Sequence, residues 1–394
     1  MKYYINEINP TGTIAVDDTL LIKGVPATAG SKMLENFKPL FSAEVVDRLE
    51  KSGYEISGKT NVGEFGLDLL GETSFFAENE STLKGAAASL VADKKIKAAL
   101  NVDLNGTPRR AAAISGVDFI KPTYGTVSRY GVISCAASGE QVGVTAGSAE
   151  NLKEILSIIA GHDSKDGTSL PNEKYEYSLD EDVSSMKIAL VTELYDKASD
   201  EIKAKIDTFV KFLESKGAKV DKISLDIVNV AQTAWQILMS AETCNNLSRF
   251  DGVKYGHRTA EYKNIDELYV KSRTEAFSFL TKATIIYGSD VLAKGKYENC
   301  YDKSMRIRRV VVDKVKEILS SYNAILTPVC GKTEYAPYDI SESFAKVYDE
   351  SIYTAIPSIT GLPAVVCGGV QLIADAFKES TLLSIADKFE KEEA

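Results

Sequence analysis

The stretch KIALVTELYDKASDEIKAKIDTFVKFLESKGAKVDKISL (187–225) carries the pattern that decides the fold. Residues 187–191 are mostly apolar and predict a buried strand. The apolar residues that follow at helical spacing are Ile202, Ile206, Phe209 and Leu213. Gly217 is a helix stop, and residues 220–225 resume the pattern of a strand. A strand, a helix and a second strand in succession predict an α/β fold.

The same alternation continues on both sides of this stretch. The further helices that the pattern predicts span 43–52, 86–92, 148–161, 305–320 and 378–393, and the further strands span 54–58, 96–102 and 323–328. Residues 228–310 are mostly helical and predict an inserted layer. Strands that alternate with helices predict a sheet covered by helices on both faces.

The composition is that of an ordinary globular protein. Hydrophobic residues make up 44% of the 394 residues and charged residues 26%. The formal net charge is −10, so the chain lacks the excess cations that release counterions from a phosphate backbone, and we expect no direct nucleic-acid binding. Neither a run of 18 apolar residues nor an apolar leader is present, which predicts a cytoplasmic protein without a membrane segment.

Few residues could hold a metal ion or form a histidine-based triad. The five cysteines are odd in number, far apart and without a CxxC pair, so neither a zinc site nor a disulfide framework is predicted. His162 and His257 are the only histidines, and we expect both to serve packing or the surface. We therefore expect no metal and no cofactor.

Two segments of small residues lie beside predicted strands. They are GAAAS (85–89) and NGT (105–107). Small residues let backbone N–H groups approach a ligand closely, so a helix N-terminus and a turn could together form an oxyanion hole. Tight packing of a helix on a strand explains Ala-rich segments equally simply, and for these segments alone it is the favoured interpretation.

Longer motifs carry a resemblance to a known family. IKPTYGTVSRYGV (120–132) resembles a signature segment of the amidase-signature enzymes. The segments that resemble one branch of that family, the A subunit of the aspartyl/glutamyl-tRNA amidotransferase, are NLSRFDGVKYGHR (246–258), GSKMLENF (30–37) and GKTN (58–61). The resemblance implies an amidase-signature fold, an α/β architecture in which a central mixed, mostly parallel sheet is covered by helices on both faces.

The resemblance extends over nearly the whole chain, from about residue 12 to residue 390. It implies a single amidase-signature domain over 1–394, with a helical insertion at about 228–310 and an N-terminus that is truncated relative to the family. Relatives cover part of their surface with N-terminal helices. We therefore predict an exposed apolar patch there, covered by a partner or by self-association.

Family members hydrolyse amides with a Ser–cisSer–Lys triad. A lysine amine is the base, a serine after a cis peptide relays the proton, and a second serine attacks the carbonyl carbon. The resemblance places Asp17 at the lysine of V-K-D-N, Leu83 at the relay serine of G-G-S-S-G-G-S and Thr107 at the nucleophile of D-T-G-G-S-I-R. All three reactive positions are therefore replaced.

The replacements remove the means of activating a hydroxyl. Leu83 has no proton to pass, and an aspartate with an ordinary pKa of roughly 4 is a far weaker base than a neutral amine. Thr107 keeps a hydroxyl, hindered by its methyl group and followed by Pro108, which lacks an N–H and restricts the residue before it. Lys84 is the nearby amine that could replace the base, although a solvated lysine at a helix start is the favoured interpretation.

The substrate side of the family site is partly kept. The resemblance places Arg308 where the family's A subunits hold an arginine that pairs with the carboxylate of bound glutamine, and a guanidinium fork suits that contact. Solvation of the basic helix face 306–309 explains the same residues equally well. The aspartate that binds the glutamine amino group in relatives has no assigned position, because residues 348–357 align with a gap.

Three functions follow from these residues. The leading one is a degenerate paralogue of the amidotransferase A subunit: a pseudoenzyme without amidase or glutaminase activity that binds or scaffolds a protein partner, such as another amidotransferase-like subunit, or self-associates. The second is an active glutamine-dependent amidotransferase or amide hydrolase that uses Thr107 with Lys84 or Asp17. The third is a sensor that binds an amino acid through Arg308 and catalyses nothing.

Overall fold

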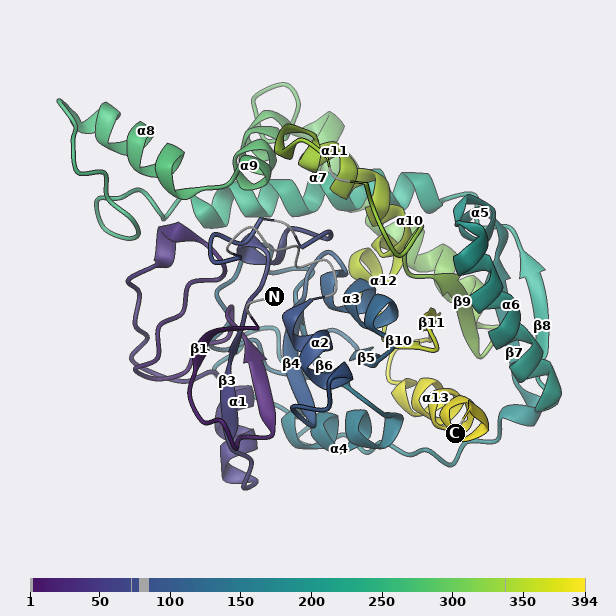
Figure 1. Ribbon diagram of the computed structural model, residues 1–394. Helices are drawn as coiled ribbons and strands as arrows, with labels where there is room; N and C mark the ends of the chain where they lie inside the picture. The colour runs from purple at the N-terminus through teal and green to yellow at the C-terminus, as the bar shows by residue number, and fades with distance from the viewer. Residues whose placement is uncertain (1–2, 72, 78–84, 337, 394) are drawn as a thin grey trace.

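The computed structural model describes residues 3–71, 73–77, 85–336 and 338–393, and its strands belong to one large sheet (Figure 1). The eleven strands in these residues are β1 (Tyr4–Glu7), β2 (Ile14–Asp17), β3 (Ile56–Thr60), β4 (Ala98–Asp103), β5 (Asp118–Lys121), β6 (Gln141–Ala146), β7 (Lys187–Val191), β8 (Lys219–Ile223), β9 (Ala324–Pro328), β10 (Ala364–Cys367) and β11 (Val370–Ile373). Their order across the sheet is β1-β3-β2-β4-β6-β5-β10-β11-β9-β7-β8.

The predicted mixed α/β fold is confirmed, but parallel pairs are not the majority. Among the described strands, β2 pairs in parallel with β3 and β4, and β7 pairs in parallel with β8 and β9. The other six pairings are antiparallel: five involve β6, β5, β10 and β11, which lie between the two parallel groups, and the sixth joins β1 to β3. Gly368 and Gly369 join β10 to β11 with φ of 55° and 76°, the left-handed conformation that a two-residue hairpin turn requires.

Helices surround this sheet. The helices in the described residues are α1 (Glu44–Lys51), α2 (Ala86–Ala92), α3 (Thr107–Ser115), α4 (Ala149–Ile159), α5 (Thr192–Lys197), α6 (Asp200–Ser215), α7 (Val228–Leu247), α8 (Ile265–Ala276), α9 (Phe279–Val291), α10 (Lys303–Leu319), α11 (Ser343–Glu350), α12 (Ala355–Thr360) and α13 (Glu379–Glu393). Short helices of other types include η1 (Lys32–Leu34) and η2 (Glu64–Gly66).

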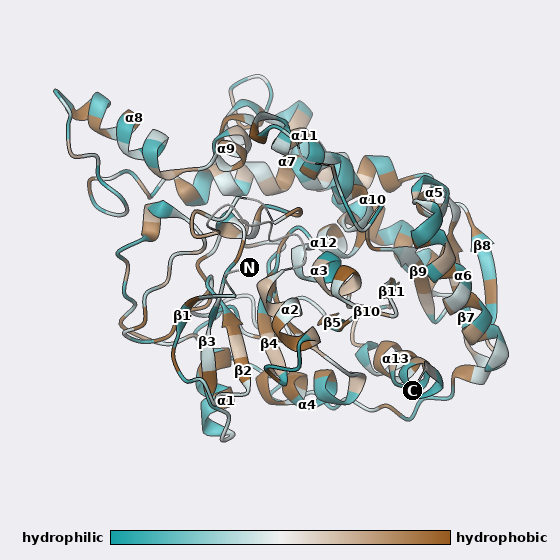
Figure 2. Ribbon diagram, in the orientation of Figure 1, coloured by the Kyte–Doolittle hydropathy of each residue, from teal (hydrophilic) through white to brown (hydrophobic). Residues whose placement is uncertain are grey.

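Successive side chains of the strands contribute to cores on opposite faces of the sheet. On β4, Ala98 and Leu100 join the cluster that includes residues of α1, α4, α6 and α13. Ala99 points the other way and joins a cluster with the Ala-rich helices α2 and α3. Strands β2 and β4 are accordingly apolar along most of their length, whereas the helices around them carry a polar face (Figure 2). Both faces of the sheet are therefore covered, as the sequence predicted.

The stretch 187–225 folds as predicted into β7, α6 and β8. The helix predicted at 148–161 is α4, and the Ser148 side chain caps it by accepting a hydrogen bond from the Asn151 N–H. In α13, Leu382, Leu383 and Phe389 are buried, so its predicted apolar face packs inward. Among the described residues, no helix has the length and apolar character needed to cross a membrane.

The predicted helical layer at 228–310 consists of α7, α8, α9 and the start of α10. Helices α7 and α9 pack closely: a Cβ on Gly288 would lie 2.0 Å from the Ser240 carbonyl oxygen. Trp235 of α7 is buried, and its Nε1–H donates to Asn105 Oδ1 at 3.1 Å. The layer is thus fixed to the turn before α3, while α8 projects away from the body of the protein (Figure 1).

Candidate active site

Two of the replaced positions meet at one small cavity. Asp17 is the last residue of β2 and Thr107 is the first residue of α3, and both line a cavity of ≈ 50 Å³ beside the start of α2. Such a space holds a few water molecules. Pockets that enclose a drug-sized ligand are larger, at roughly 300–1,000 Å³. Two of the three positions therefore line one cavity, and its volume is too small for an amino acid.

The hydroxyl of Thr107 contacts the backbone. Its Oγ1 donates to the Asp68 carbonyl oxygen at 3.1 Å, and this is its only hydrogen bond in the part of the chain that the structure describes. Gly106, just before it, has a φ of 97°, and a Cβ there would lie 2.4 Å from Thr354 Cβ. Because a carbonyl oxygen does not take up a proton near neutral pH, this contact does not activate the hydroxyl.

Asp17 is buried and fully engaged. Its Oδ1 accepts hydrogen bonds from the N–H and the hydroxyl of Thr19, and its Oδ2 accepts one from the Val102 N–H at 2.7 Å. Burial raises the pKa of Asp17 to about 6, against the opposing effect of these hydrogen bonds. The described residues include no hydrogen bond between Asp17 and Thr107. The carboxylate therefore links β2 to β4 rather than serving as the base of Thr107.

The two lysines near the family motifs, Lys59 and Lys84, give no replacement base within the described residues. Leu83 and Lys84 both lie outside the described residues, so the structure gives no account of the relay position. Lys59, in the GKTN motif, is fully buried and forms an ion pair with Asp18, with 2.9 Å between Nζ and Oδ1. Its ammonium also donates to the Pro26 carbonyl oxygen at 3.2 Å. Lys59 therefore belongs to a structural pair, a role that the motif alone did not reveal.

The two charged residues that flank Thr107 in the motif, Asp103 and Arg109, form a buried ion pair. Arg109 Nε and Nη2 donate to the two carboxylate oxygens of Asp103, at 2.6 and 3.1 Å. The remaining N–H groups of Arg109 donate to Gln371 Oε1, to the Thr354 carbonyl oxygen and to Ser358 Oγ. All five donors of the guanidinium are used, and both side chains of the pair are fully buried. This pair fixes the turn of Thr107 to α12 and β11.

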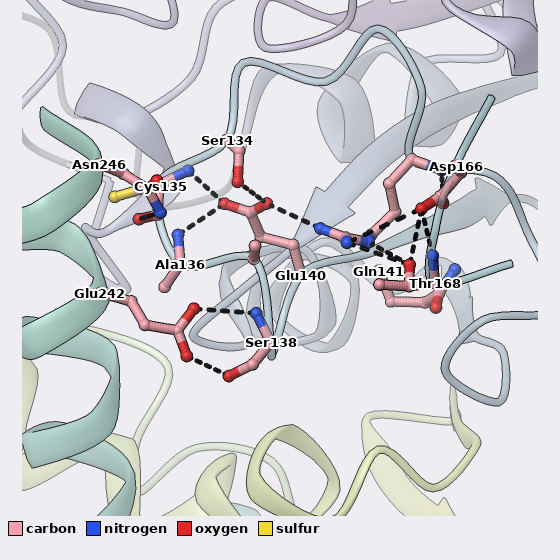
Figure 3. A network of polar contacts seen from close by, with 12 residues as sticks. Ser134, Cys135, Ala136, Ser138, Glu140, Gln141, Asp166, Thr168, Glu242 and Asn246 are labelled. Atoms are coloured by element: carbon pink, nitrogen blue, oxygen red, sulfur yellow. Dashed lines mark hydrogen bonds and ion pairs between the residues drawn. The ribbon is translucent and has the colours of Figure 1, made fainter. Parts of the chain in front are cut away.

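Arg308 lies apart from the small cavity and is not among its lining residues. It is half-buried on α10, and its guanidinium donates to Ser138, to Oγ at 3.4 Å and to the carbonyl oxygen at 3.1 Å. Ser138 in turn donates through its N–H and its hydroxyl to Glu242 of α7 (Figure 3). Within the described residues, no carboxylate lies within 4.0 Å of Arg308. Its charge thus remains available to an anion, but the structure does not bring it together with Thr107.

The segment 120–140, which begins with the signature motif, forms a buried polar network (Figure 3). Glu140 accepts hydrogen bonds from the N–H groups of Cys135 and Ala136 and from the Ser134 hydroxyl. Burial raises the pKa of Glu140, and Arg129 lies 3.6 Å from its carboxylate. The sequence analysis did not single out Glu140, because a carboxylate in a loop gives no signal of burial. Its role in the fold is to hold this loop in place.

Metal ligation receives no support from the described residues, since they contain no cluster of three or more His, Cys, Asp or Glu side chains placed to hold a metal ion. The two histidines serve packing contacts, as predicted. His162 Nδ1 lies 3.0 Å from the Leu170 carbonyl oxygen. His257 lies between two carboxylates, with Nδ1 at 3.0 Å from Glu35 and Nε2 at 2.9 Å from Glu275.

Known proteins resemble this chain over most of its length. The family model described as Amidase matches residues 13–383. The A subunit of the glutamyl-tRNA(Gln) amidotransferase of Lachnospira eligens is 36% identical over 399 residues, which cover 96% of this chain and 83% of that protein. The protein of the same name from Sulfurihydrogenibium sp. is 36% identical over 398 residues, covering 96% of this chain and 82% of that protein.

A solved structure resembles the whole architecture. The A subunit of the glutamyl-tRNA(Gln) amidotransferase of Thermotoga maritima superposes with a TM-score of 0.80 at 26% sequence identity, and the match covers 99% of this chain and 87% of that chain. Sequence and fold therefore lead to the same assignment. The chain belongs to the amidase family and resembles, within it, the A subunits of glutamyl-tRNA(Gln) amidotransferases.

Proposed function

We propose that this A-subunit-like protein has lost amide hydrolysis and acts by binding a protein partner. The observation that carries the proposal is the direction of the Thr107 hydroxyl, which donates to the Asp68 carbonyl oxygen instead of to a base. Asp17, at the position of the family's lysine, accepts hydrogen bonds from Thr19 and Val102. A hydroxyl without a positioned base stays protonated and is a poor nucleophile.

Glutamine hydrolysis by the purified chain tests this directly. We expect no ammonia release above the protein-free rate, either alone or in mixtures with candidate amidotransferase subunits, and no change in Thr107→Ala. Thr107→Ser is the matched control, because it restores the family's nucleophile without restoring a base, and we expect it to be equally inactive. Glutaminase activity that Thr107→Ala abolishes would overturn the proposal.

The binding role rests on what the fold retains. The buried pairs Asp103–Arg109 and Asp18–Lys59 keep the framework around the former site intact. The relatives in the comparison are named as subunits, so we propose that a second subunit is the partner. With a net charge of −10, the chain is a poor direct binder of tRNA, and the partner would supply that contact. The exposed apolar side chains of the protein include Phe37, Leu40 and Phe41. If no second subunit covers them, self-association would.

One observation favours residual activity as a second candidate function. Thr107 and Asp17 line the same cavity, and a pKa of about 6 makes Asp17 a better base than an ordinary aspartate. The Thr107 hydroxyl would then have to turn from the Asp68 carbonyl oxygen to Asp17. A probe that acylates serine hydrolases distinguishes the two functions, because only a competent nucleophile is labelled.

The half-buried guanidinium of Arg308 favours a third candidate, a sensor of amino acids. Its only partner among the described residues is Ser138, so a ligand carboxylate could bind the N–H donors of Arg308 that Ser138 leaves unused. If the sensor function holds, glutamine, glutamate, asparagine or aspartate at about 100 times its Kd should stabilise the protein by roughly 2.7 kcal/mol in thermal unfolding. Arg308→Ala should remove the shift, whereas Arg309→Ala, which removes an exposed cation of the same helix, should not. A shift that survives Arg308→Ala would exclude this site.

A further inference from the structure

A second, larger cavity lies outside the former active site. Its volume is ≈ 940 Å³, and none of its lining residues lines the small cavity of Asp17 and Thr107. The lining comes from the segment that follows η1, from residues 132–134 and from the loop 249–258 after α7. The volume falls within the range of pockets that hold small organic ligands, roughly 300–1,000 Å³.

The inner surface of this cavity is apolar. Its buried or half-buried apolar lining residues include Leu21, Met33, Leu34, Val132, Ile133 and Phe250. Phe250 is held by stacking on Phe65 of η2, with ring centroids 5.8 Å apart. A Cβ on Gly256 would lie 2.3 Å from Met33 Sδ, so the loop approaches η1 closely. The surface is therefore built by packed side chains and is preformed for an apolar group.

The rim of the cavity is cationic. Arg249, Lys254 and Arg258 line it, all three are exposed, and within the described residues none has a carboxylate within 4.0 Å. The hydrogen bonds of the two arginines leave their charges uncompensated: Arg249 donates to Asn246, and Arg258 donates to the Tyr262 hydroxyl.

The rim carries little negative charge of its own. Glu35 is the only carboxylate among the described lining residues, and its Oε1 lies 3.0 Å from His257 Nδ1. Three cations thus face one carboxylate that already has a partner. The charge of the rim therefore favours an anion, and the interior favours an apolar group.

We propose that this cavity binds a small amphipathic carboxylate, with an aliphatic or aromatic body in the apolar interior and the carboxylate among Arg249, Lys254 and Arg258. The body gains by leaving water, and the head gains from charges that have no other partner. The cavity shares no residue with the former active site, so this binding is independent of any hydrolysis.

Two fluorescent probes that differ only in charge test the proposal. These are 8-anilinonaphthalene-1-sulfonate, whose sulfonate stands in for the carboxylate, and the neutral N-phenyl-1-naphthylamine. We expect the sulfonate to bind at one saturable site, and decanoate to displace it while decan-1-ol does not. Lys254→Gln combined with Arg258→Gln should weaken the sulfonate about tenfold, as expected for the loss of two partly screened contacts, and leave the neutral probe within twofold.

The matched control is Lys294→Gln, which removes an exposed cation that does not line the cavity. An unchanged melting temperature shows that each variant is folded. If the double variant unfolds, the intact protein still decides: its affinity for the sulfonate should fall with added salt, while its affinity for the neutral probe should not. Absence of saturable binding, failure of decanoate to displace the probe, or equal weakening by Lys294→Gln would each overturn the proposal.

Discussion

Arg109→Met is expected to lower the free energy of unfolding by about 3–5 kcal/mol, because it leaves the Asp103 carboxylate charged and buried without its partner. Both side chains of the pair are fully buried, and the guanidinium forms five hydrogen bonds that no apolar side chain replaces. The loss would be measured by urea denaturation followed through the fluorescence of Trp235, the only tryptophan in the chain.

Three further variants serve as comparisons for Arg109→Met. Arg309→Met removes an arginine whose ion pair with Asp313 is exposed, and we expect it to cost less than about 1 kcal/mol. Arg109→Lys keeps the charge but not the fork, so it should fall between the two. Removing both charges, in Asp103→Leu with Arg109→Met, should restore part of the stability. A loss below about 1 kcal/mol for Arg109→Met would show that the pair does not hold the turn of Thr107 in place.

Long amphipathic elements could be predicted from the sequence. The helix at 200–215 and the strand at 187–191 have unbroken apolar periodicity, and both fold where the pattern indicated. Strands β5, β6, β10 and β11 were not predicted. They are four to six residues long, and charged or polar residues within them are buried, as at Asp118, Lys121 and Gln371. Local hydropathy cannot identify such strands, because their polar groups are satisfied by distant segments.

The candidate site shows the same limit. That Asp17 and Thr107 replace reactive residues follows from matching motifs, and so does their expected proximity. The partners of each side chain do not follow, because they come from remote parts of the chain. Asp17 bonds to the backbone 85 residues away, and Arg308 bonds to Ser138, 170 residues away. These contacts depend on the pairing of β2 with β4 and on the placement of α10, which no local pattern contains.

The two buried ion pairs and the hydrogen bonds of Asp17 connect neighbouring elements around the candidate site. The buried ion pair Asp103–Arg109 links β4 to α3, and the buried ion pair Asp18–Lys59 links the end of β2 to β3. Asp17 accepts hydrogen bonds from the N–H groups of Thr19 and Val102, so its carboxylate makes structural contacts between β2 and β4. The ionisation of Asp17 gives a way to measure how much these contacts contribute to stability.

The stability of the protein is expected to fall as Asp17 ionises. Burial raises the pKa of Asp17 from 3.8 to about 6. A carboxyl group with a raised pKa in the folded state contributes its full stability below pH 4, and the contribution is lost as the pH rises through about 6. Asp17→Asn cannot ionise, so the free energy of unfolding of the natural protein, relative to this variant, should fall by about 3 kcal/mol between pH 4 and pH 7.5.

The difference in stability between the natural protein and Asp17→Asn shows whether the Asp17 carboxyl is buried in the folded state. At pH 4 the natural protein should be the more stable, because a protonated carboxyl carries one O–H and keeps two oxygens that can accept, whereas an asparagine amide places two N–H groups and no acceptor at one of these positions, against the N–H of Thr19 or Val102. Thr107→Ala changes the same cavity without a titrating group, and it should retain the natural pH dependence. If the gap between the natural protein and Asp17→Asn stays constant from pH 4 to pH 7.5, then Asp17 is ionised at little cost and is open to water. The pKa of Asp17 would then be close to its ordinary value, and the residual-activity function would lose the raised pKa that favours it.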